Sequence, residues 1–546
     1  MVKTKKRKFI FVVGGVLSGV GKGVTTASLG AIFVSKGLRA TTIKIDPYIN
    51  VDAGTMNPTE HGEVFVTDDG DETDQDMGNY ERFLDVSLTS TNYMTTGRVY
   101  QTVIDNERSM KYKGRCVQVV PHIPEEIIRR IRTAAEFNDA QITIIEIGGT
   151  AGEYENILFL EAARMMKLKD PADVAFVLVS YLPVPAHLGE MKTKPTQHAV
   201  RALNSVGINP EFIIARGRSA LDKPRREKLA ILCGVPKEHC IAAPDVPSVY
   251  EIPLVLEKQG LGSKLLKSLR MPTRKSDLSA WKGLNKKIQD GKKKVKIAVV
   301  GKYFGTGDFT LADSYISVIE AVKHAAWFNN AHPEMEWVDS EEFEKRPANV
   351  KKLAKYNGII VPGGFGTRGV EGIIRAVTFA RENKKPYLGL CYGMQLACIE
   401  FARNVLNIEG ATTVEMDDDA TEPVIHISPV QAANVRENRY VGTMRLGAYD
   451  CVLKEGSKTY KAYGERKISE RHRHRYEFNN DYREMMEKAG LKVVGVNPES
   501  NLVEIVELDG HPFFVGTQFH PEFKSRPMRP QPLFREFVRA AVERRK

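Results

Sequence analysis

The chain has no run of 18 apolar residues, so its 546 residues are not expected to contain a membrane-spanning helix. Its six cysteines, at positions 116, 233, 240, 391, 398 and 451, form no C-x-x-C pair. They therefore predict neither a disulfide framework nor a zinc site, and they favour a reducing compartment. The first eight residues are rich in lysine and arginine, but the apolar run behind them is too short for a signal peptide. We expect a cytoplasmic protein.

Motifs that combine aromatic and basic residues to bind RNA or DNA are also missing, although the formal net charge is +11. The positive charge is explained by a solvated basic surface together with binding sites for nucleotides. We expect neither a nucleic acid nor a membrane as a partner. The sequence shows no short internal repeat and no low-complexity tail, and its 42% of hydrophobic residues can fill at least two cores.

Short apolar segments alternate with helix-like segments, a pattern typical of parallel sheets covered by helices. In the first half we expect strands at residues 9–13, 41–45, 142–147, 174–180 and 212–215, and helices at 23–35 and 157–167. In the second half we expect strands at 295–300, 358–361, 387–390 and 513–517, and a helix at 313–327. Residues 272–296 hold nine Lys or Arg and two Asp, which indicates a solvated linker with some helix. The predicted limits are a first domain at 1–271, a linker at 272–294 and a second domain at 295–546.

The second domain carries a candidate nucleophile. Cys391 follows an apolar segment and lies between Gly389 and Gly393, which allow the sharp strand-to-helix turn of a nucleophile elbow. About 130 residues later, His520 and Glu522 supply a base and a carboxylate to orient it. Backbone N–H groups of residues 363–364 could form an oxyanion hole. This combination predicts thiolate attack on an amide, whereas a lone cysteine is usually a core residue. Residues 471–476 read Arg-His-Arg-His-Arg-Tyr and could be a basic patch, a metal tract or, in this setting, a contact to a substrate carboxylate.

The first domain opens with a strand, a glycine-rich loop and a lysine, an arrangement suited to phosphate groups. The match to a strict P-loop is imperfect. Five residues separate Gly15 from Gly21 where the pattern has four, and Gly23 follows Lys22 where the pattern has Ser or Thr. Taken alone, the loop could equally be a structural glycine turn.

Acidic residues offer candidate magnesium ligands near that loop. Glu146 lies inside an apolar strand, where an unpaired carboxylate is costly and requires a cation. Asp76 ends an acidic stretch, residues 68–76, which otherwise resembles a solvated loop. We hypothesise that both carboxylates hold Mg²⁺ against ATP phosphates. Residues 192–197 place two ammonium groups, two hydroxyls and an amide together, which suits a second polyanion unless they form an ordinary surface loop.

Over nearly its full length the chain resembles the CTP synthase family. The segments that carry the resemblance are residues 44–52, 61–66, 146–150, 192–197, 442–447 and 471–476. The second half alone would resemble only the broad class I glutamine amidotransferases. The resemblance implies a P-loop, dethiobiotin-synthetase-like amidoligase domain with a parallel sheet, followed by a class I glutamine amidotransferase domain.

The resemblance also implies an activity. The first domain would phosphorylate the 4-oxygen of UTP with ATP and Mg²⁺, and ammonia would then displace the phosphate to give CTP, the last step of de novo CTP synthesis. The second domain would release that ammonia from glutamine through a thioester, and an internal tunnel would carry it. GTP would activate the reaction, CTP would inhibit it, and the enzyme would be a homotetramer with the possibility of filaments.

The resemblance assigns roles to individual residues. The triad would be Cys391, His520 and Glu522. ATP would contact Ser18, Gly19, Val20, Gly21, Lys22, Gly23, Val24, Lys44, Asp76, Asp245 and Val246, and Mg²⁺ would contact Asp76 and Glu146. UTP or the inhibitor CTP would contact Ser18, Glu153, Tyr154, Glu155, Lys192, Thr193, Lys194, Pro195, Thr196, Gln197 and Lys228. Glutamine would contact Gly364, Tyr392, Gly393, Met394, Gln395, Glu415 and Arg475.

Several positions depart from the family pattern. Glu153 stands where Asp is common, Pro244 where Lys contacts the adenine, and Tyr392 where Leu is common. Residues 411–437 and 439–442 also differ from the usual loops. None of these positions is the nucleophile, the base or Lys22, so we expect an active enzyme whose regulation differs.

Three alternatives remain at this point. Another ATP-dependent amidoligase, of the cobyric-acid-synthase type, would need an acceptor pocket different from residues 192–197. A partition-type ATPase that binds DNA would be supported only by the basic charge. A structural, filament-forming protein cannot be recognised from sequence.

Overall fold

The computed structural model describes residues 7–57, 61–185, 189–291, 293–302, 305–306, 309–310, 312–427 and 444–544. The chain packs into two compact units. The first contains residues 1–55 and 76–285, and the second contains residues 56–75 and 286–546. A short segment from the first half of the sequence therefore belongs to the second unit. The domain limits of 1–271 and 295–546 stay a prediction.

A seven-stranded parallel sheet forms the centre of the first unit, in the order β5-β2-β6-β1-β7-β8-β9. The five predicted strands are confirmed to within two residues, whereas β5 and β9 were not predicted. The strands are β1 (Lys8–Gly14), β2 (Ala40–Asp46), β5 (Tyr93–Thr95), β6 (Ile142–Ile147), β7 (Val174–Tyr181), β8 (Phe212–Gly217) and β9 (Cys240–Pro244).

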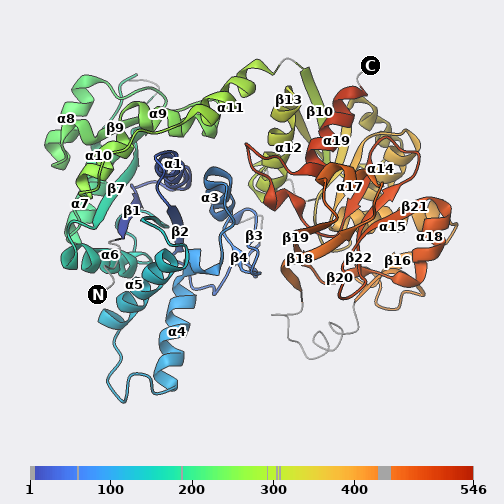
Figure 1. The fold of residues 1–546 in the computed structure, drawn as a ribbon, viewed down its shortest axis with the longest axis horizontal. Helices are drawn as coiled ribbons and strands as arrows, with labels where there is room; N and C mark the ends of the chain where they lie inside the picture. The colour runs from blue at the N-terminus through green and yellow to red at the C-terminus, as the bar shows by residue number, and fades with distance from the viewer. Residues whose placement is uncertain are drawn as a thin grey trace. The chain divides into compact units, whose positions relative to one another are not determined.

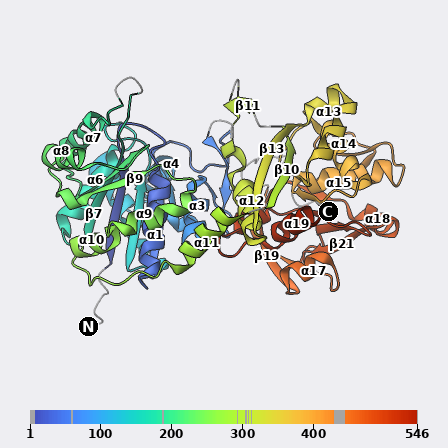
Figure 2. The same ribbon diagram turned by 90° about the horizontal axis from the view of Figure 1, so that it is seen from above.

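Both faces of this sheet are buried. In β1, Phe9 and Phe11 enter one core, whereas Ile10 and Val12 enter the other. Burial on two faces explains why the strands are nearly continuous apolar runs. The helices on one face are α1 (Lys22–Ser35), α9 (Ile252–Lys258) and α10 (Leu261–Ser268) (Figure 1 and Figure 2). Those on the other face are α4 (Thr96–Arg108), α5 (Val119–Phe137), α6 (Ile157–Lys169), α7 (Lys194–Ser205) and α8 (Lys223–Cys233).

The second unit is built on a mixed nine-stranded sheet in the order β13-β10-β14-β15-β23-β22-β21-β18-β19. The first five strands are parallel and include all four that the sequence predicted; the other four pair antiparallel and were not predicted. The strands are β10 (Lys293–Gly301), β13 (Ala331–Asp339), β14 (Gly358–Val361), β15 (Tyr387–Leu390), β18 (Arg445–Leu453), β19 (Lys467–His474), β21 (Leu491–Val496), β22 (Val503–Leu508) and β23 (Phe514–Thr517).

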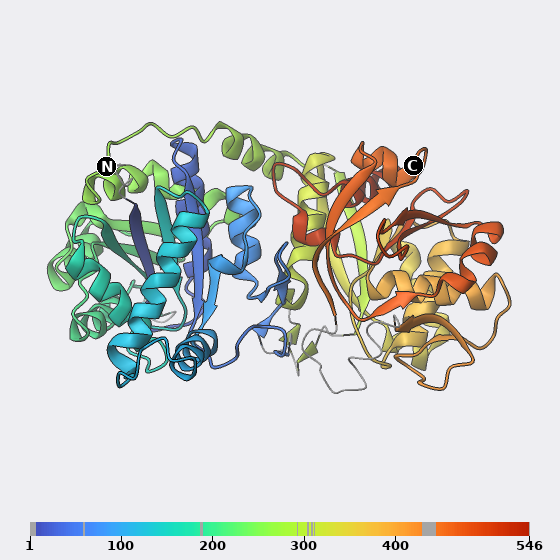
Figure 3. The same cartoon turned by 60° about the horizontal axis from the view of Figure 1, so that its bottom comes forward.

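Helices cover both faces of this second sheet as well. Helices α12 (Ile316–Phe328) and α19 (Pro532–Glu543) share one core, and α14 (Val370–Glu382) and α15 (Tyr392–Asn404) share the other. The unit runs from yellow-green β10 to the orange and red strands in Figure 3. Helix α12 begins three residues later than predicted, because residues 312–315 form a 3-10 turn. The predicted linker contains helix α11 (Ser279–Asp290), and its last residues begin β10.

Residues 56–75 form a segment that packs within the second unit and carries a hairpin of β3 (Phe65–Val66) and β4 (Glu72–Thr73), drawn in blue in Figure 1. The buried Glu63 carboxylate accepts hydrogen bonds from Ser317 at the start of α12. The Asp68 carboxylate lies 2.5 Å from Arg471 Nε, and the Glu72 carboxylate lies 2.7 Å from Arg473 Nε. The idea that residues 68–76 form only a solvated acidic loop was therefore wrong, because these carboxylates are paired with cations.

Among the described residues, no helix is long and apolar enough to cross a membrane. Residue 292 of the predicted linker lies outside the described residues, as do residues 439–442 and the part of 411–437 that begins at 428.

Candidate functional sites

Cys391 lies at the sharp turn between β15 and α15 and caps the start of that helix. Its backbone has φ 49° and ψ −99°, a region that costs a non-glycine residue on the order of 1–3 kcal/mol. A Cβ at Gly393 would lie 2.3 Å from the Val361 carbonyl oxygen, so the next turn admits only glycine. The strained turn that the sequence predicted is present, and strain of this kind concentrates at functional sites.

His520 lies between the sulfur and a carboxylate. Its Nδ1 is 2.8 Å from Glu522 Oε1, and the Cys391 sulfur is near enough to act on the ring electrostatically. Burial lowers the pKa of His520, but Glu522 and the Cys391 sulfur outweigh burial and raise it to about 10. The imidazole thus favours the protonated form, which suits a residue that supplies a proton to the leaving ammonia. The structure brings the three predicted triad residues together.

The predicted oxyanion loop follows β14 and lies against this base. A Cβ at Gly363 would be 2.7 Å from His520 Cε1, so glycine is required for the loop to approach the imidazole. A Cβ at Gly364 would be 3.5 Å from the Tyr392 ring, which places Gly364 beside the residue that follows the nucleophile. Gly363 thus lies against the His520 imidazole, and Gly364 lies against the residue that follows Cys391.

Gly366, in the same loop, is held from three sides. Its carbonyl oxygen accepts hydrogen bonds from Tyr392 Oη at 2.6 Å and from Lys302 Nζ at 2.5 Å, and its N–H donates to Glu415 Oε1 at 2.7 Å. The Lys302 ammonium also lies 4.7 Å from the centre of the Tyr392 ring. Burial lowers the pKa of Lys302 to about 8, and burial raises the pKa of Glu415. We call Tyr392, Lys302 and Glu415 the clamp, because all three are hydrogen bonded to Gly366. Tyr392, which departs from the family pattern, therefore helps to fix this loop.

Lys302 was missed by the sequence analysis. A signal was available, because Lys302 directly follows β10, and ligands bind at the carboxyl ends of parallel strands. The positive charge of Arg475, which was predicted, partly offsets the effect of burial on the pKa of Glu415. Met394 and Gln395 are buried in α15, and the side chain of Gln395 donates hydrogen bonds to the Tyr476 carbonyl and to Gln518 Oε1.

Replacing Tyr392 with phenylalanine is expected to raise the KM for glutamine about fivefold, since one neutral hydrogen bond contributes ~1 kcal/mol. Ammonia-dependent turnover is expected to stay unchanged. The matched control is Tyr463→Phe, which also removes a buried hydroxyl but one that bonds Glu470. Steady-state kinetics with varied glutamine check this, and an unchanged KM in the Tyr392 variant would exclude the clamp from substrate binding.

The phosphate-binding loop of the first unit connects β1 to α1. Gly19 and Gly21 have φ 67° and 87°, a conformation in which L residues are strained. Lys22 begins α1 and is held over the loop, since its Nζ donates to the Gly149 carbonyl at 2.6 Å. Burial lowers the pKa of Lys22, and Glu146 opposes that effect. A helix start, glycines with positive φ and a half-buried lysine together suit an anion.

The imperfect P-loop match has a steric explanation. A Cβ at Gly23 would lie 2.0 Å from Asp76 Oδ1, so the serine or threonine of the strict pattern has no room beside this carboxylate. Asp76 begins α3 (Asp76–Leu84), which packs on α1. The glycine at position 23 therefore lets the Asp76 carboxylate approach the loop where the strict pattern has a hydroxyl side chain.

Two carboxylates and a lysine converge beside the loop. Lys44 Nζ lies 2.5 Å from Asp76 Oδ2 and 3.3 Å from Glu146 Oε1. The register of β2 and β6 places Lys44 directly beside Glu146, and Tyr80 donates a hydrogen bond to Glu146. Burial raises the pKa of Glu146; burial also opposes ionisation of Asp76, but Lys44 outweighs it and lowers the pKa of Asp76.

These carboxylates fit a magnesium ion. Within the described residues, no group of three or more His, Cys, Asp or Glu side chains could hold a metal alone. Mg²⁺ in phosphoryl-transfer sites needs only one or two carboxylates, because phosphates and water complete its coordination. Asp76 and Glu146 already share the cationic Lys44 in this structure, so the pair is arranged to hold positive charge.

Two predicted segments for the pyrimidine nucleotide lie beside the phosphate-binding loop. Ser180 connects the loop to residues 192–197: a Cβ at Gly15 would be 2.9 Å from Ser180 Oγ, which is itself 2.9 Å from Thr196 Oγ1. Glu153 accepts hydrogen bonds from the Thr150 N–H and hydroxyl, at 2.9 and 2.7 Å. By contrast, Tyr154 is 91% exposed, and Glu155 and Lys228 are exposed too. Within one chain these three side chains are not enclosed.

The adenine assignment involves a residue that was not predicted. Arg216, at the end of β8, lies 3.2 Å from Asp245 Oδ1 and donates to the Pro244 carbonyl. A Cβ at Gly21 would be 3.6 Å from Arg216 Nε, so this arginine also borders the phosphate-binding loop. Arg216 thus lies between Asp245, with which it pairs, and the phosphate-binding loop, which it borders.

Comparison with known proteins defines the class of each half. Residues 8–271 match the family model described as "CTP synthase N-terminus". Residues 310–540 match the model described as "Glutamine amidotransferase class-I". The chain is thus an α/β synthetase domain with a parallel sheet joined to a class I glutamine amidotransferase domain, as the sequence predicted.

Similarity over the whole length is more specific. A protein from Symbiobacterium thermophilum named CTP synthase is 50% identical over 543 residues, which cover 98% of this chain and 99% of that protein. The CTP synthase of Thermococcus gammatolerans is 50% identical over 540 residues, with 98% and 99% covered. The solved structure of the glutaminase domain of Trypanosoma brucei CTPS with bound acivicin is 38% identical, covers 46% of this chain and 94% of that chain, and has a TM-score of 0.42.

The chain belongs to the CTP synthase family. It is a ligase that aminates UTP to CTP in pyrimidine biosynthesis, with ATP as co-substrate and a glutamine amidotransferase domain as part of the same chain. The cobyric-acid-type, partition-type and purely structural alternatives are thereby excluded.

Proposed function

We propose that the two units divide the reaction between a sulfur site and a phosphate site. The observation that carries the sulfur site is Cys391 on its strained turn, with its sulfur acting electrostatically on a His520 that Glu522 orients. The thiolate attacks the carboxamide carbon of glutamine, forming an S–C bond. The C–N bond then breaks, and ammonia leaves with a proton from His520. Water hydrolyses the thioester to glutamate and restores the thiol.

In the first unit, we propose that ATP phosphates bind at the start of α1 beside Lys22 and that the γ-phosphoryl group passes to the 4-oxygen of UTP. Lys22 and Lys44 stabilise the negative charge of the transferred group. Ammonia then adds to carbon 4 and phosphate leaves, which gives CTP. Support comes from the convergence of Lys44, Asp76 and Glu146 beside the loop.

Mixing the protein with ATP, a magnesium salt and UTP, and either glutamine or an ammonium salt, tests the proposal directly. The absorbance of the cytosine product is expected to appear with both nitrogen donors. Product from ammonia alone would contradict the sulfur site, and product from neither donor would contradict both sites.

Asp76 and Glu146 would hold Mg²⁺, which when bound supplies positive charge that shields the transferred phosphoryl group. Glu146→Gln keeps the shape but removes the charge, so the Mg²⁺ concentration for half-maximal ammonia-dependent turnover is expected to rise about tenfold or more. Glu126→Gln is the matched control, since Glu126 is also buried but pairs with Arg129 and Arg130. An unchanged Mg²⁺ requirement in the Glu146 variant would remove this residue from the metal site.

We also propose the finer properties that the family resemblance implies: activation by GTP, inhibition by CTP, a homotetramer and a cytoplasmic location. The exposure of Tyr154, Glu155 and Lys228 supports the homotetramer, because a second subunit could enclose them. Glu153 supports altered CTP inhibition, since its carboxylate is bonded to Thr150. Sedimentation with and without UTP and ATP would measure the oligomeric state.

A further inference from the structure

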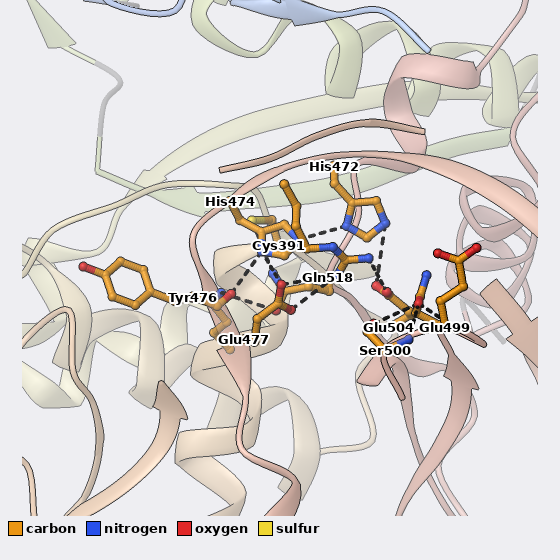
Figure 4. A network of polar contacts seen from close by, with 12 residues as sticks. Cys391, His472, His474, Tyr476, Glu477, Glu499, Ser500, Glu504 and Gln518 are labelled. Carbon is orange, nitrogen blue, oxygen red and sulfur yellow. Dashed lines mark hydrogen bonds and ion pairs between the residues drawn. The ribbon is translucent and has the colours of Figure 1, made fainter. Parts of the chain in front are cut away.

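Gln518 is a fully buried amide beside the nucleophile, two residues before His520. Its side-chain nitrogen donates a hydrogen bond to Cys391 Sγ, with 3.6 Å between nitrogen and sulfur. Its side-chain oxygen accepts a hydrogen bond from Gln395 Nε2 at 3.3 Å. Figure 4 shows Gln518 and Cys391 side by side within a network of polar side chains.

The backbone carbonyl of Tyr476 determines which way the side-chain amide of Gln518 is turned. The backbone carbonyl of Tyr476 can only accept, and Gln395 Nε2 lies 3.0 Å from it. The amino group of Gln395 must therefore face Tyr476, and its second hydrogen is directed to Gln518 Oε1. Gln518 then presents its own amino group to the sulfur, as the structure has it.

A second group fixes the same carbonyl. His474 Nδ1 lies 3.0 Å from the Tyr476 oxygen and must carry the hydrogen of that contact, since the carbonyl cannot donate. His474 Nε2 is then free to accept from His472 Nδ1, at 2.9 Å (Figure 4). Burial lowers the pKa of both histidines well below the usual value, so both rings are neutral and these single tautomers persist at working pH. The carbonyl that orients Gln395 is thus itself held in place.

The position of Gln518 matters because sulfur changes its charge during the reaction. As a thiolate, Cys391 is a strong acceptor for an N–H donor; as a thioester it is a weak one. A donor at the sulfur therefore favours the thiolate before attack. It also favours departure of the sulfur when water cleaves the thioester, since a more stable thiolate leaves faster.

We propose that Gln518 is a further catalytic residue of the glutaminase site, which stabilises the sulfur anion by hydrogen bonding, and that Gln395 is a positioning residue that orients it. Gln518 transfers no proton: the bonds that form and break are the S–C and C–N bonds described above, and His520 supplies the proton. The inference rests on the proposed role of Cys391 as the nucleophile.

The test compares Gln518→Met, which keeps the length of the side chain but has no donor, with the unaltered residue. Both are made together with Cys116→Ser, because Cys116 is the exposed cysteine and the other five are buried. The rate of carboxamidomethylation of Cys391 by iodoacetamide is measured at pH 7 and pH 9.5 by mass spectrometry. The ratio of the pH 7 rate to the pH 9.5 rate is expected to fall about tenfold in the variant, since hydrogen bonds to charged groups are the strong ones.

Acid quenching during turnover of labelled glutamine supplies a second readout. Gln518→Met is expected to lower the kcat for glutamine about tenfold and to accumulate more covalently bound label, because thioester cleavage slows. Gln395→Met is expected to lower the alkylation ratio by less, since it loosens Gln518 without removing the donor at the sulfur. A merely structural role for Gln518 would change neither the alkylation ratio nor the fraction of bound label.

The outcomes separate this inference from the proposed function. If iodoacetamide abolishes glutamine-dependent turnover but Gln518→Met leaves the alkylation ratio and kcat unchanged within about twofold, the role of Gln518 is overturned and that of Cys391 stands. If modification of Cys391 leaves glutamine-dependent turnover intact, the proposed nucleophile itself is wrong. A thermal unfolding transition that matches that of the unaltered chain shows that a variant is folded; if Gln518→Met lacks it, the Gln395→Met measurements decide the question.

Discussion

Replacing Cys391 with alanine is expected to lower glutamine-dependent CTP formation at least about ten-thousandfold, while ammonia-dependent formation stays within about twofold. The reason is that the sulfur is the atom that accepts a hydrogen bond from Gln518 and that helps to raise the pKa of His520. Without it, no thioester forms and no ammonia is released. The phosphate site belongs to the other unit and keeps its residues. Parallel assays with glutamine and with an ammonium salt measure both reactions.

Cys398→Ala is the matched control, because Cys398 lies on the same helix, α15, and is buried in the core. Burial raises the pKa of its thiol to about 12, so this cysteine is not reactive at neutral pH. Its loss is expected to spare both reactions. Equal loss of glutamine- and ammonia-dependent turnover in the Cys391 variant would contradict the division of labour between the two units.

Replacing Lys22 with methionine is expected to lower turnover with either nitrogen donor by about 10²–10³, the effect of removing one group that stabilises charge in a transition state. Both reactions use the same phosphorylated UTP, so both depend on this lysine. The half-buried Nζ is held beside the loop by the Gly149 carbonyl. Initial rates of CTP formation with saturating glutamine or ammonium salt measure the effect.

The control for charge is Lys267→Met, an exposed lysine on α10 in the same unit. It removes one positive charge without touching the phosphate-binding loop, so its rates are expected to match those of the unaltered chain. Ammonia-dependent turnover that survives in the Lys22 variant would show that phosphoryl transfer does not rely on Lys22.

Local sequence signals predicted the residues that are close together in the chain or follow a strand directly. The turn around Cys391 needs glycines at fixed spacing, and His520 and Glu522 lie two residues apart, so the triad was readable. The strand containing Glu146 was predicted because it is an unbroken apolar run. For Gln518 a signal existed, since side chains two residues apart in an extended segment share a side, and Gln518 therefore follows His520.

Other features depend on contacts between distant segments. The antiparallel strands of the second sheet were not predicted. In β18 and β19, charged and polar residues interrupt the apolar ones, so neither strand is the continuous apolar run typical of a parallel strand. The role of Gly23 became clear only when α3 placed the Asp76 carboxylate against it. The pairing of Asp68 and Glu72 with Arg471 and Arg473 spans about 400 positions of sequence, which no local pattern encodes.

That pairing limits how the enzyme can be cut and recombined. Arg471 is fully buried, and its carbonyl oxygen accepts the backbone N–H of His520. A chimaera that took only residues 295–546 from a relative would place foreign residues against Asp68 and Glu72. It would also disturb the close approach of Gly447 to Gly70, where a Cβ at Gly447 would lie 2.7 Å from the Gly70 nitrogen. Shuffling of amidotransferase halves between family members therefore has to carry residues 56–75 along as part of the exchanged piece.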